Sequence, residues 1–176
     1  MEDDPLMQRA QRGDAEAFAA LFDRYQKAIF NFMRRLGMSR GAAEEGTQEV
    51  FLKLWERRDQ YRPGGGFRAY LYRIARNHRI NQFRRGPVNP HRYLEGRGPG
   101  NGDPAVAAER KDARARALRA VESLAEDVRI PFVLKQMQGL SYAEVAQVTG
   151  LTQRQAEDRV AEAFEKLARS LREVGA

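Results

Sequence analysis

The chain has 176 residues, a formal net charge of +7 and a sequence pI of about 10.0. This length allows one or two small domains, and the basic balance favours a polyanionic partner. Cysteine is absent, which excludes disulfides and thiolate metal sites, and two isolated histidines, His78 and His91, are too few for a metal centre. No stretch approaches the roughly 20 apolar residues of a membrane span or the apolar run of a signal peptide. We therefore expect a cytoplasmic protein without membrane insertion, metal or cofactor.

The positive charge is concentrated in the first half of the chain. Residues 1–85 carry 17 basic and 11 acidic side chains, so six of the seven excess positive charges lie there. Residues 86–104 contain five glycines and four prolines, a composition typical of a linker. We therefore predict an all-α fold with two small helical domains, residues 1–85 and 105–176. A flexible Gly/Pro linker over residues 86–104 joins them, and the polyanion site lies in the first domain.

Two helices are predicted at the start of the first domain. Asp14 is a suitable N-cap for the first helix, which carries a sustained apolar stripe and ends at Gly37. Ser39 can cap the second helix, which runs to about Arg58. Gly46 lies inside this second helix and weakens the prediction for its first turns, because glycine costs about 1 kcal/mol relative to alanine there.

A polar connector, residues 59–66, precedes a third helix over residues 67–85. Its three consecutive glycines allow positive φ angles or a close approach to a ligand, and a flexible turn is the alternative interpretation. The third helix has six arginines, interleaved aromatic residues and no acid. Arginine pairs with phosphate, and aromatic rings stack on unpaired bases for about 1–3 kcal/mol each. A solvated helix usually mixes both signs of charge, so this composition favours nucleic-acid binding over a plain solvated face.

The second domain is predicted to begin with helices over about residues 105–123 and 130–138. Pro131 limits how far the latter helix can extend toward its N-terminus without a kink.

Two capping boxes follow in the second domain. The first, SYAE from Ser141, starts a short helix that ends at Gly150, and the second, TQRQ from Thr152, starts a longer one. A short helix, a glycine turn and a second capped helix form the helix-turn-helix pattern.

Together these segments resemble the extracytoplasmic-function (ECF, group four) sigma factors of bacterial RNA polymerase. The resemblance covers about residues 13–85 and 118–171. It rests on GDAEAFAALFDRY from Gly13, QEVFLKLW from Gln48, FRAYLYRIARN from Phe67, GLSYAEVA from Gly139, and the segment from Arg159 to Leu167. It implies an alternative sigma factor that binds core RNA polymerase and promoter DNA and directs promoter-specific transcription initiation. It also implies no enzymatic activity and regulation by an anti-sigma factor.

The resemblance assigns roles to four groups of residues. The second helix would bind core polymerase through Gln48, Glu49, Phe51, Leu52, Lys53, Trp55 and Glu56. The connector and third helix would open the minus-ten element and hold a flipped base, through Tyr61, Arg62, Phe67, Tyr70, Arg76 and Asn77. Phosphates would be held by Arg73, Arg79, Arg84 and Arg85. The helix-turn-helix would read the minus-thirty-five element through Ser141, Thr152, Gln153, Arg154, Gln155 and Arg159. Stacking and hydrogen bonding to a flipped base offset an unstacking cost of a few kcal/mol.

The recognition helix departs from the family pattern. Gln155-Ala-Glu-Asp-Arg159 stands where the family usually has Thr-Val-Lys-Ser-Arg, and Glu162 replaces a usual arginine. Residues 152–171 carry four basic and four acidic side chains, so this helix is neutral. Acids near phosphates weaken binding, although Glu or Asp can accept a hydrogen bond from cytosine. We therefore expect weak or unusual DNA contact here. The alternative is a sigma-like decoy or adaptor that binds an anti-sigma protein without initiating transcription.

Overall fold

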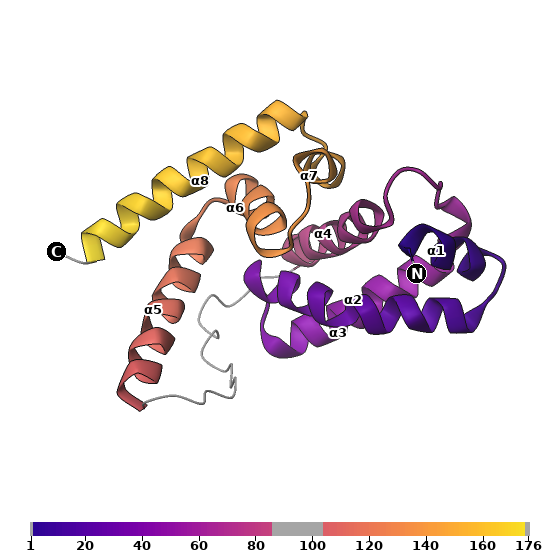
Figure 1. The fold of residues 1–176 in the computed structure, drawn as a ribbon, viewed down its shortest axis with the longest axis horizontal. Helices are drawn as coiled ribbons and strands as arrows, with labels where there is room; N and C mark the ends of the chain where they lie inside the picture. Colours follow the sequence, from indigo (N-terminus) through magenta and orange to yellow (C-terminus); the bar gives the residue numbers. More distant parts are fainter. Residues whose placement is uncertain (1, 86–103, 175–176) are drawn as a thin grey trace.

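The computed structural model describes residues 2–85 and 104–174, and every regular element within these ranges is a helix (Figure 1). The first half contains α1 (Asp3–Gln11), α2 (Ala15–Arg35), α3 (Arg40–Glu56), the short 3-10 helix η1 (Arg58–Gln60) and α4 (Phe67–Arg85). The second half contains α5 (Pro104–Ser123), α6 (Glu126–Phe132), the π-helical turn η2 (Val133–Met137), α7 (Tyr142–Thr149) and α8 (Gln153–Val174). The predicted all-α fold is confirmed. The predicted linker lies outside the described residues except for Pro104, which begins α5.

Side-chain caps fix the N-terminal ends of α2 and α3. The Asp14 carboxylate accepts a hydrogen bond from the backbone N–H of Ala17 at 3.0 Å, and Ser39 Oγ accepts from Ala42 N–H at 3.3 Å. Both predicted N-caps are therefore confirmed. In space, α2 packs against α1 and α3, and α3 packs against α4.

The helix α3 continues through Gly46, because this residue lies at a tight contact. A Cβ atom there would lie 2.7 Å from the sulfur of Met33 and 3.0 Å from Nε2 of His78. The absence of a side chain thus lets α3 approach α2 and α4 closely. This packing compensates for the low helix propensity of glycine.

The second half confirms both capping boxes and corrects one helix start. Ser141 Oγ accepts from Glu144 N–H at 3.2 Å, and the corresponding bond from Gln155 N–H to Thr152 Oγ1 is also 3.2 Å. We expected a helix from about residue 130, but α6 begins at Glu126 and includes Pro131. Because proline lacks the N–H that would bond to the carbonyl four residues earlier, the regular hydrogen bonding is interrupted there, and η2 follows directly.

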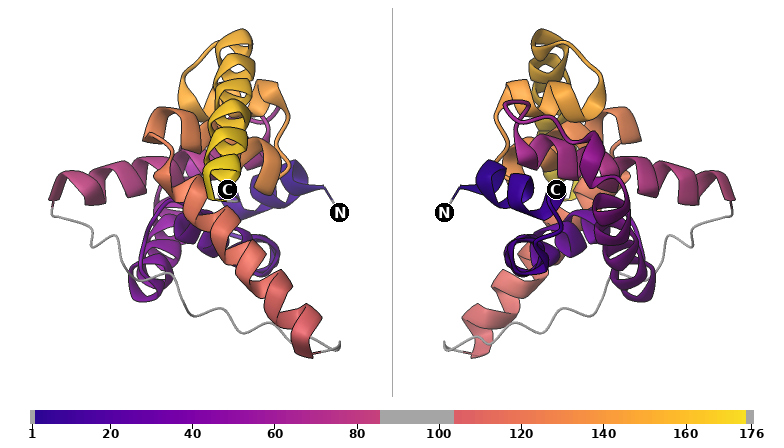
Figure 2. Two further views of the ribbon diagram at one scale, coloured as in Figure 1. Left: turned by 90° about the vertical axis from the view of Figure 1, so that its left-hand side faces the viewer. Right: turned by 90° about the vertical axis from the view of Figure 1, so that its right-hand side faces the viewer.

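The two halves pack against each other, with α7 against α4, and α5 and η2 against α2. Arg68 Nη2 of α4 donates to the carbonyl oxygen of Gln138 at 2.8 Å, and the hydroxyl of Tyr72 donates to Gln138 Oε1 at 2.8 Å. Buried residues of both halves form one hydrophobic cluster. The side views in Figure 2 show α4 and α5 extending in different directions from this junction.

Candidate nucleic-acid interface

A basic pocket of about 160 Å³ lies between the C-terminal part of α3 and the middle of α4. Three residues predicted for the minus-ten element, Tyr70, Arg73 and Asn77, line it together. The guanidinium of Arg73 lies 5.5 Å from the centre of the Tyr70 ring. The remaining lining residues are Lys53, Arg57, Gln60, Ile74, His78 and Asn81. With cations, amides and a tyrosine ring but no acid in its lining, the pocket suits an unpaired base and its phosphate.

Sequence reasoning missed five residues that line this pocket: Arg57, Gln60, Ile74, His78 and Asn81. Lys53, which we expected to contact polymerase, also lines it, and its Nζ lies 3.3 Å from Nδ1 of His78. Burial and the nearby Lys53 lower the pKa of His78, so the neutral imidazole accepts this hydrogen bond. Spacing offers one signal that could have found the pocket: Lys53 and Arg57 are four residues apart and therefore share a helix face.

Buried aromatic rings from the connector and the start of α4 pack behind the Tyr70 ring that lines the pocket. Tyr61 and Phe67 are both buried, and the Tyr61 ring centre lies 5.3 Å from that of Tyr70 and 6.2 Å from that of Phe67. Tyr70 is half-buried and Arg62 is exposed. Gly64 adopts a φ of 88°, as a glycine permits. Of the three predicted aromatic residues, only Tyr70 presents part of its ring to the pocket, whereas the other two pack behind it.

The arginines of α4 divide into two kinds. Arg73 is exposed and Arg76 is half-buried, so both can approach a phosphate. Arg79, expected to do the same, is only 1% exposed, and its guanidinium donates to the carbonyl oxygen of Leu36. In this arrangement Arg79 joins helices instead of facing solvent. The side chains of Arg84 and Arg85 lie outside the described part of the chain.

The residues predicted to contact polymerase also divide by burial. Gln48, Leu52 and Glu56 are exposed along one face of α3, with Leu52 50% exposed. Phe51 is buried, and its ring centre lies 4.8 Å from that of Phe22 of α2. Glu49 is half-buried, as is Trp55, whose ring is covered by the guanidinium of Arg58 at 4.3 Å from its centre. A docking partner on this face would therefore meet Leu52 and its polar neighbours, while Phe51 stabilises the bundle.

The start of the recognition helix α8 is open to solvent. Ser141, Thr152, Gln153, Arg154 and Gln155 are all exposed, as a helix-turn-helix requires.

Arg159, further along α8, is held by acids. It lies 3.0 Å from the Glu162 carboxylate and 3.4 Å from that of Asp127, and Glu162 also pairs with Lys166 at 2.7 Å. The hydrogen bonds from Lys166 and Arg159 lower the pKa of Glu162, which therefore stays charged. Intramolecular ion pairs thus occupy two of the cations of this helix.

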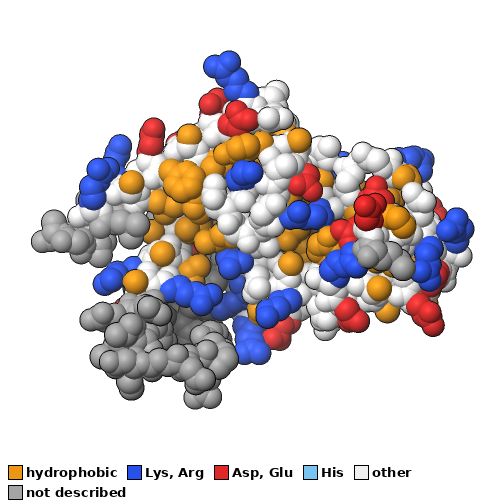
Figure 3. All heavy atoms as spheres, in the orientation of Figure 1, with side chains coloured by type: hydrophobic (Ala, Val, Ile, Leu, Met, Phe, Trp, Pro, Cys, Tyr) orange, Lys and Arg blue, Asp and Glu red, His pale blue; other side chains and the backbone are white. Residues whose placement is uncertain are grey.

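An apolar cavity of about 470 Å³ lies between α2, α5, α6 and α8. Its lining includes Phe30, Leu118, Phe132 and Leu167, together with basic side chains such as Arg35. Hydrophobic side chains also reach the surface between α6 and α8 (Figure 3).

Known proteins match this chain over both halves. The family model described as Sigma-70 region 2 matches residues 21–86, and that described as Sigma-70, region 4 matches residues 114–167. The ECF RNA polymerase sigma-E factor of Escherichia coli (strain K12) is 31% identical over 159 residues, which cover 84% of this chain and 83% of the relative. The RNA polymerase sigma-H factor of Pseudomonas aeruginosa is 30% identical over 158 residues, covering 84% of this chain and 82% of that protein.

Solved structures agree with the fold. CnrH in complex with the cytosolic domain of CnrY superposes with a TM-score of 0.76 at 27% identity, and 96% of each chain is covered. RpoE of Bartonella quintana, solved with the anti-sigma factor NepR, has a TM-score of 0.75 at 22% identity, covering 90% of this chain and 98% of that one. Among the residues the structure describes, no helix is long and apolar enough to cross a membrane. The expected resemblance is confirmed: the chain belongs to the ECF family of RNA polymerase sigma factors and is an alternative sigma factor.

Proposed function

We propose that this sigma factor opens the minus-ten element by capturing an unpaired base in the basic pocket between α3 and α4. The observation that carries this proposal is the convergence of Tyr70, Arg73 and Asn77 with Lys53 and Arg57 in one cavity. The ring offers stacking, the amide offers hydrogen bonds, and the cations offer phosphate contacts. The polymerase performs the chemistry, so the chain is a regulator and not an enzyme, and it works in the cytoplasm beside the polymerase.

The exposed face of α3 is the proposed docking surface for core polymerase. Gln48, Leu52 and Glu56 are spaced four residues apart, which puts them on one stripe of the helix. A half-exposed leucine between polar residues is a suitable centre for a protein contact. Glu49 and Trp55 flank this stripe, and Phe51 supports it from within the bundle.

The start of α8 is the proposed reader of the minus-thirty-five element. Thr152, Gln153, Arg154 and Gln155 are exposed there, where a helix-turn-helix contacts base edges. The ion pairs of Arg159 reduce its availability to phosphate, which favours a modest contribution of α8 to affinity. The same observation supports the second candidate function, a sigma-like decoy or adaptor that binds an anti-sigma protein without initiating transcription.

We further infer that an anti-sigma protein regulates this chain by occupying the apolar cavity between α2, α5, α6 and α8. The cavity is bordered by both halves of the molecule, so an occupant would fix their relative arrangement. CnrH, which shares this fold, was solved in complex with the cytosolic domain of CnrY. An amphipathic helix with acidic residues beside its apolar face would complement the lining, which combines Phe30 and Leu167 with Arg34 and Arg35.

Run-off transcription tests the proposed function. Core polymerase with this protein is supplied with the DNA upstream of its own gene, either as duplex or with the minus-ten region pre-melted. Transcripts from both templates are expected, and Asn77→Ala and Arg73→Ala should lower the yield from duplex while leaving core binding intact. Product only from the pre-melted template would mean that duplex recognition or opening needs another factor. No product from either, together with binding to an anti-sigma protein, would establish the decoy.

A further inference from the structure

The N-terminal helix α1 is bound to the connector that leads into α4. At one end of this contact, Gln11 Nε2 donates to the carbonyl oxygen of Arg58 at 2.9 Å and to that of Tyr61 at 3.0 Å. At the other end, the carboxylate of Asp4 reaches the second part of the connector. The connector is therefore held along its length by side chains from a helix about 50 residues or more away in sequence.

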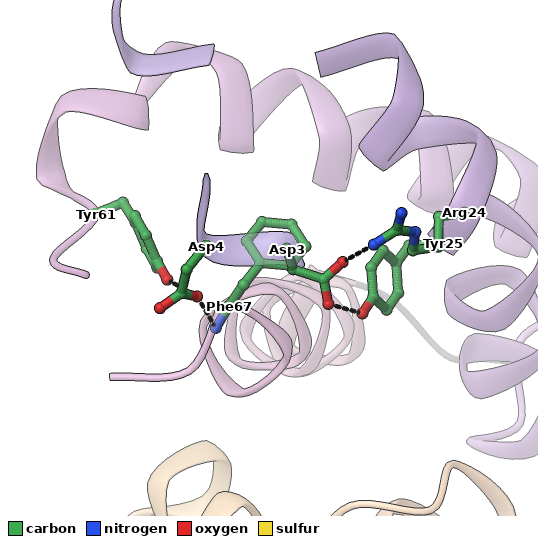
Figure 4. A network of polar contacts seen from close by, with 6 residues as sticks. All are labelled: Asp3, Asp4, Arg24, Tyr25, Tyr61 and Phe67. Atoms are coloured by element: carbon green, nitrogen blue, oxygen red, sulfur yellow. Dashed lines mark hydrogen bonds and ion pairs between the residues drawn. The ribbon is translucent and has the colours of Figure 1, made fainter. Parts of the chain in front are cut away.

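The Asp4 carboxylate accepts three hydrogen bonds from the connector and the start of α4. Its Oδ1 accepts from the hydroxyl of Tyr61 and from the backbone N–H of Phe67 at 3.2 Å (Figure 4). Its Oδ2 accepts from Gly64 N–H at 3.2 Å. Phe67 is the first residue of α4, so its N–H has no partner within the helix, and an anion is favourable at this end. The bond from Tyr61 lowers the pKa of Asp4, which keeps the carboxylate charged.

The neighbouring acid, Asp3, contacts a different part of the molecule. Its carboxylate accepts from the hydroxyl of Tyr25 and pairs with Arg24, both on α2 (Figure 4). Asp3 thus ties α1 to the helical bundle, while Asp4 ties α1 to the connector. Two adjacent residues of identical charge therefore contact separate parts of the molecule.

The conformation of the connector determines what the pocket presents. Gln60 lines the pocket, and the ring of Tyr61 packs against Tyr70, which also lines it. Three consecutive glycines, residues 64–66, would otherwise sample many conformations, and ordering them upon DNA binding would reduce affinity. An acid beside this loop also repels DNA phosphates. It favours DNA binding only if ordering the loop raises the affinity by more than this repulsion lowers it.

We propose that Asp4 is a positioning residue for promoter opening, whose carboxylate holds residues 61–67 in the conformation that receives the unpaired base without touching DNA. This inference rests on the proposed function of the α3–α4 pocket. It gives the N-terminal helix a role in promoter opening that acts only through the connector. Asp3 is the comparison, because its own hydrogen bond and ion pair are with α2 and it reaches residues 61–67 only through the Tyr25 ring, whose centre lies 5.5 Å from that of Phe67.

The test compares Asp4→Asn with Asp3→Asn in full-length protein bound to core polymerase. The measurements are core affinity, affinity for a single-stranded minus-ten oligonucleotide from its own promoter, and permanganate reactivity of the opened promoter. Each variant loses one negative charge, so general electrostatics alone would raise the DNA affinity of both. We expect Asp4→Asn instead to lower oligonucleotide affinity about tenfold, the loss typical of hydrogen bonds to a charged group, with core affinity unchanged. Asp3→Asn should retain both affinities.

Equal oligonucleotide affinity of the two variants, or tighter binding by Asp4→Asn, would overturn the positioning role and leave the pocket itself intact. Failure of the wild-type holoenzyme to bind the oligonucleotide would instead refute the proposed function on which the role depends. Tyr61→Phe removes one of the three donors while keeping the ring, so it should show a smaller loss in the same direction. If circular dichroism shows that Asp4→Asn does not fold, Tyr61→Phe is compared with Asp3→Asn instead. Unchanged oligonucleotide binding by Tyr61→Phe would then overturn the positioning role of Asp4.

Discussion

Arg79 of α4 donates two hydrogen bonds to the carbonyl oxygen of Leu36 in the turn after α2, from Nε at 3.0 Å and from Nη2 at 2.6 Å. Its Nη1 also lies 3.9 Å from the carboxylate of Glu126 in α6. One buried cation therefore connects three helices from both halves of the chain. A buried charge stabilises a fold only while its hydrogen bonds are made, so this residue is expected to be sensitive to truncation.

Truncation of Arg79 should lower stability more than DNA binding. Arg79→Ala leaves the Leu36 carbonyl without its donor and removes packed methylenes, so we expect the free energy of unfolding to fall by about 3 kcal/mol. Arg73→Ala, at an exposed position on the same helix, should change it by less than about 0.5 kcal/mol and instead weaken oligonucleotide binding. Urea denaturation and fluorescence anisotropy measure the two effects. A stable Arg79→Ala variant that loses DNA affinity would restore the phosphate role expected from sequence.

Glycine 46 should resist replacement by a better helix former. Gly46→Ala gains up to about 1 kcal/mol of helix propensity, but its Cβ would meet Met33 and His78 at 3.0 Å or less. Overpacking typically costs about 1–3 kcal/mol, so we expect net destabilisation in urea. Gly41→Ala is the matched control, because the described structure has nothing within 4 Å of a Cβ there, and this variant should be stabilised. Stabilisation by both substitutions would mean that α3 packs less tightly than described.

Acid should destabilise the first half of the chain through His78. Burial, then the charge of Lys53, lowers the pKa of this imidazole, while Glu49 and Glu45 act in the opposite direction. Above the ordinary pKa of about 6.5, histidine is neutral in both states and its contribution to stability is complete. As the pH falls below that value, only the unfolded chain takes up the proton, so stability falls by up to about 1.4 kcal/mol per pH unit until the lower folded pKa is passed.

The measurement is urea denaturation of wild type and His78→Asn from pH 7.5 to pH 5. The difference between the two proteins should shrink as the pH falls, since the variant cannot take up this proton. Hydrogen bonds lower the pKa values of Asp4 and Asp14, so these groups lose their stabilising contribution only when the pH falls below the ordinary pKa of aspartate. Their titration therefore lies outside the pH range of this measurement. A constant difference across the range would show that His78 has the same pKa in the folded and unfolded chain.

Features that depend on neighbours in sequence were predictable here. The caps at Asp14 and Ser39, the box from Ser141 and the stop at Gly150 each need only a few consecutive residues, and all are present. The stripe of Tyr70, Arg73 and Asn77 likewise follows from helical spacing within α4. The family resemblance assigned these three residues to the minus-ten element, and the structure places them in one pocket, while DNA binding by this face of α4 stays a prediction.

Features that depend on distant segments were not predictable. The helix α1 is acidic at its start and has only three buried residues, so nothing in its own sequence indicates that Asp4 binds a connector some 60 residues later. Arg79 is buried because it donates to the backbone carbonyl of Leu36. Every residue has such a carbonyl, so the sequence does not indicate which one is the acceptor. Likewise, Phe51 belongs to a polymerase-binding motif by resemblance, yet the aromatic rings of α2 decide that it is internal.

The acidic side chains of α8 should lower the affinity of this helix for duplex DNA. Glu162 pairs with both Arg159 and Lys166, so Glu162→Gln removes one negative charge, releases Lys166 from this carboxylate and leaves Arg159 paired with Asp127 alone. Each additional phosphate contact steepens the dependence of log affinity on log salt by about 0.9, so we expect tighter promoter binding and a steeper slope by one to two such steps. Glu165→Gln makes the same charge change at an exposed position of the same helix and serves as the control. Fluorescence anisotropy of the full-length protein on a minus-thirty-five duplex, between low and moderate salt, gives both quantities. Equal slopes for the two variants would mean that Arg159 and Lys166 do not reach phosphates once this carboxylate is removed, and that the neutral recognition helix limits duplex binding by its total charge alone.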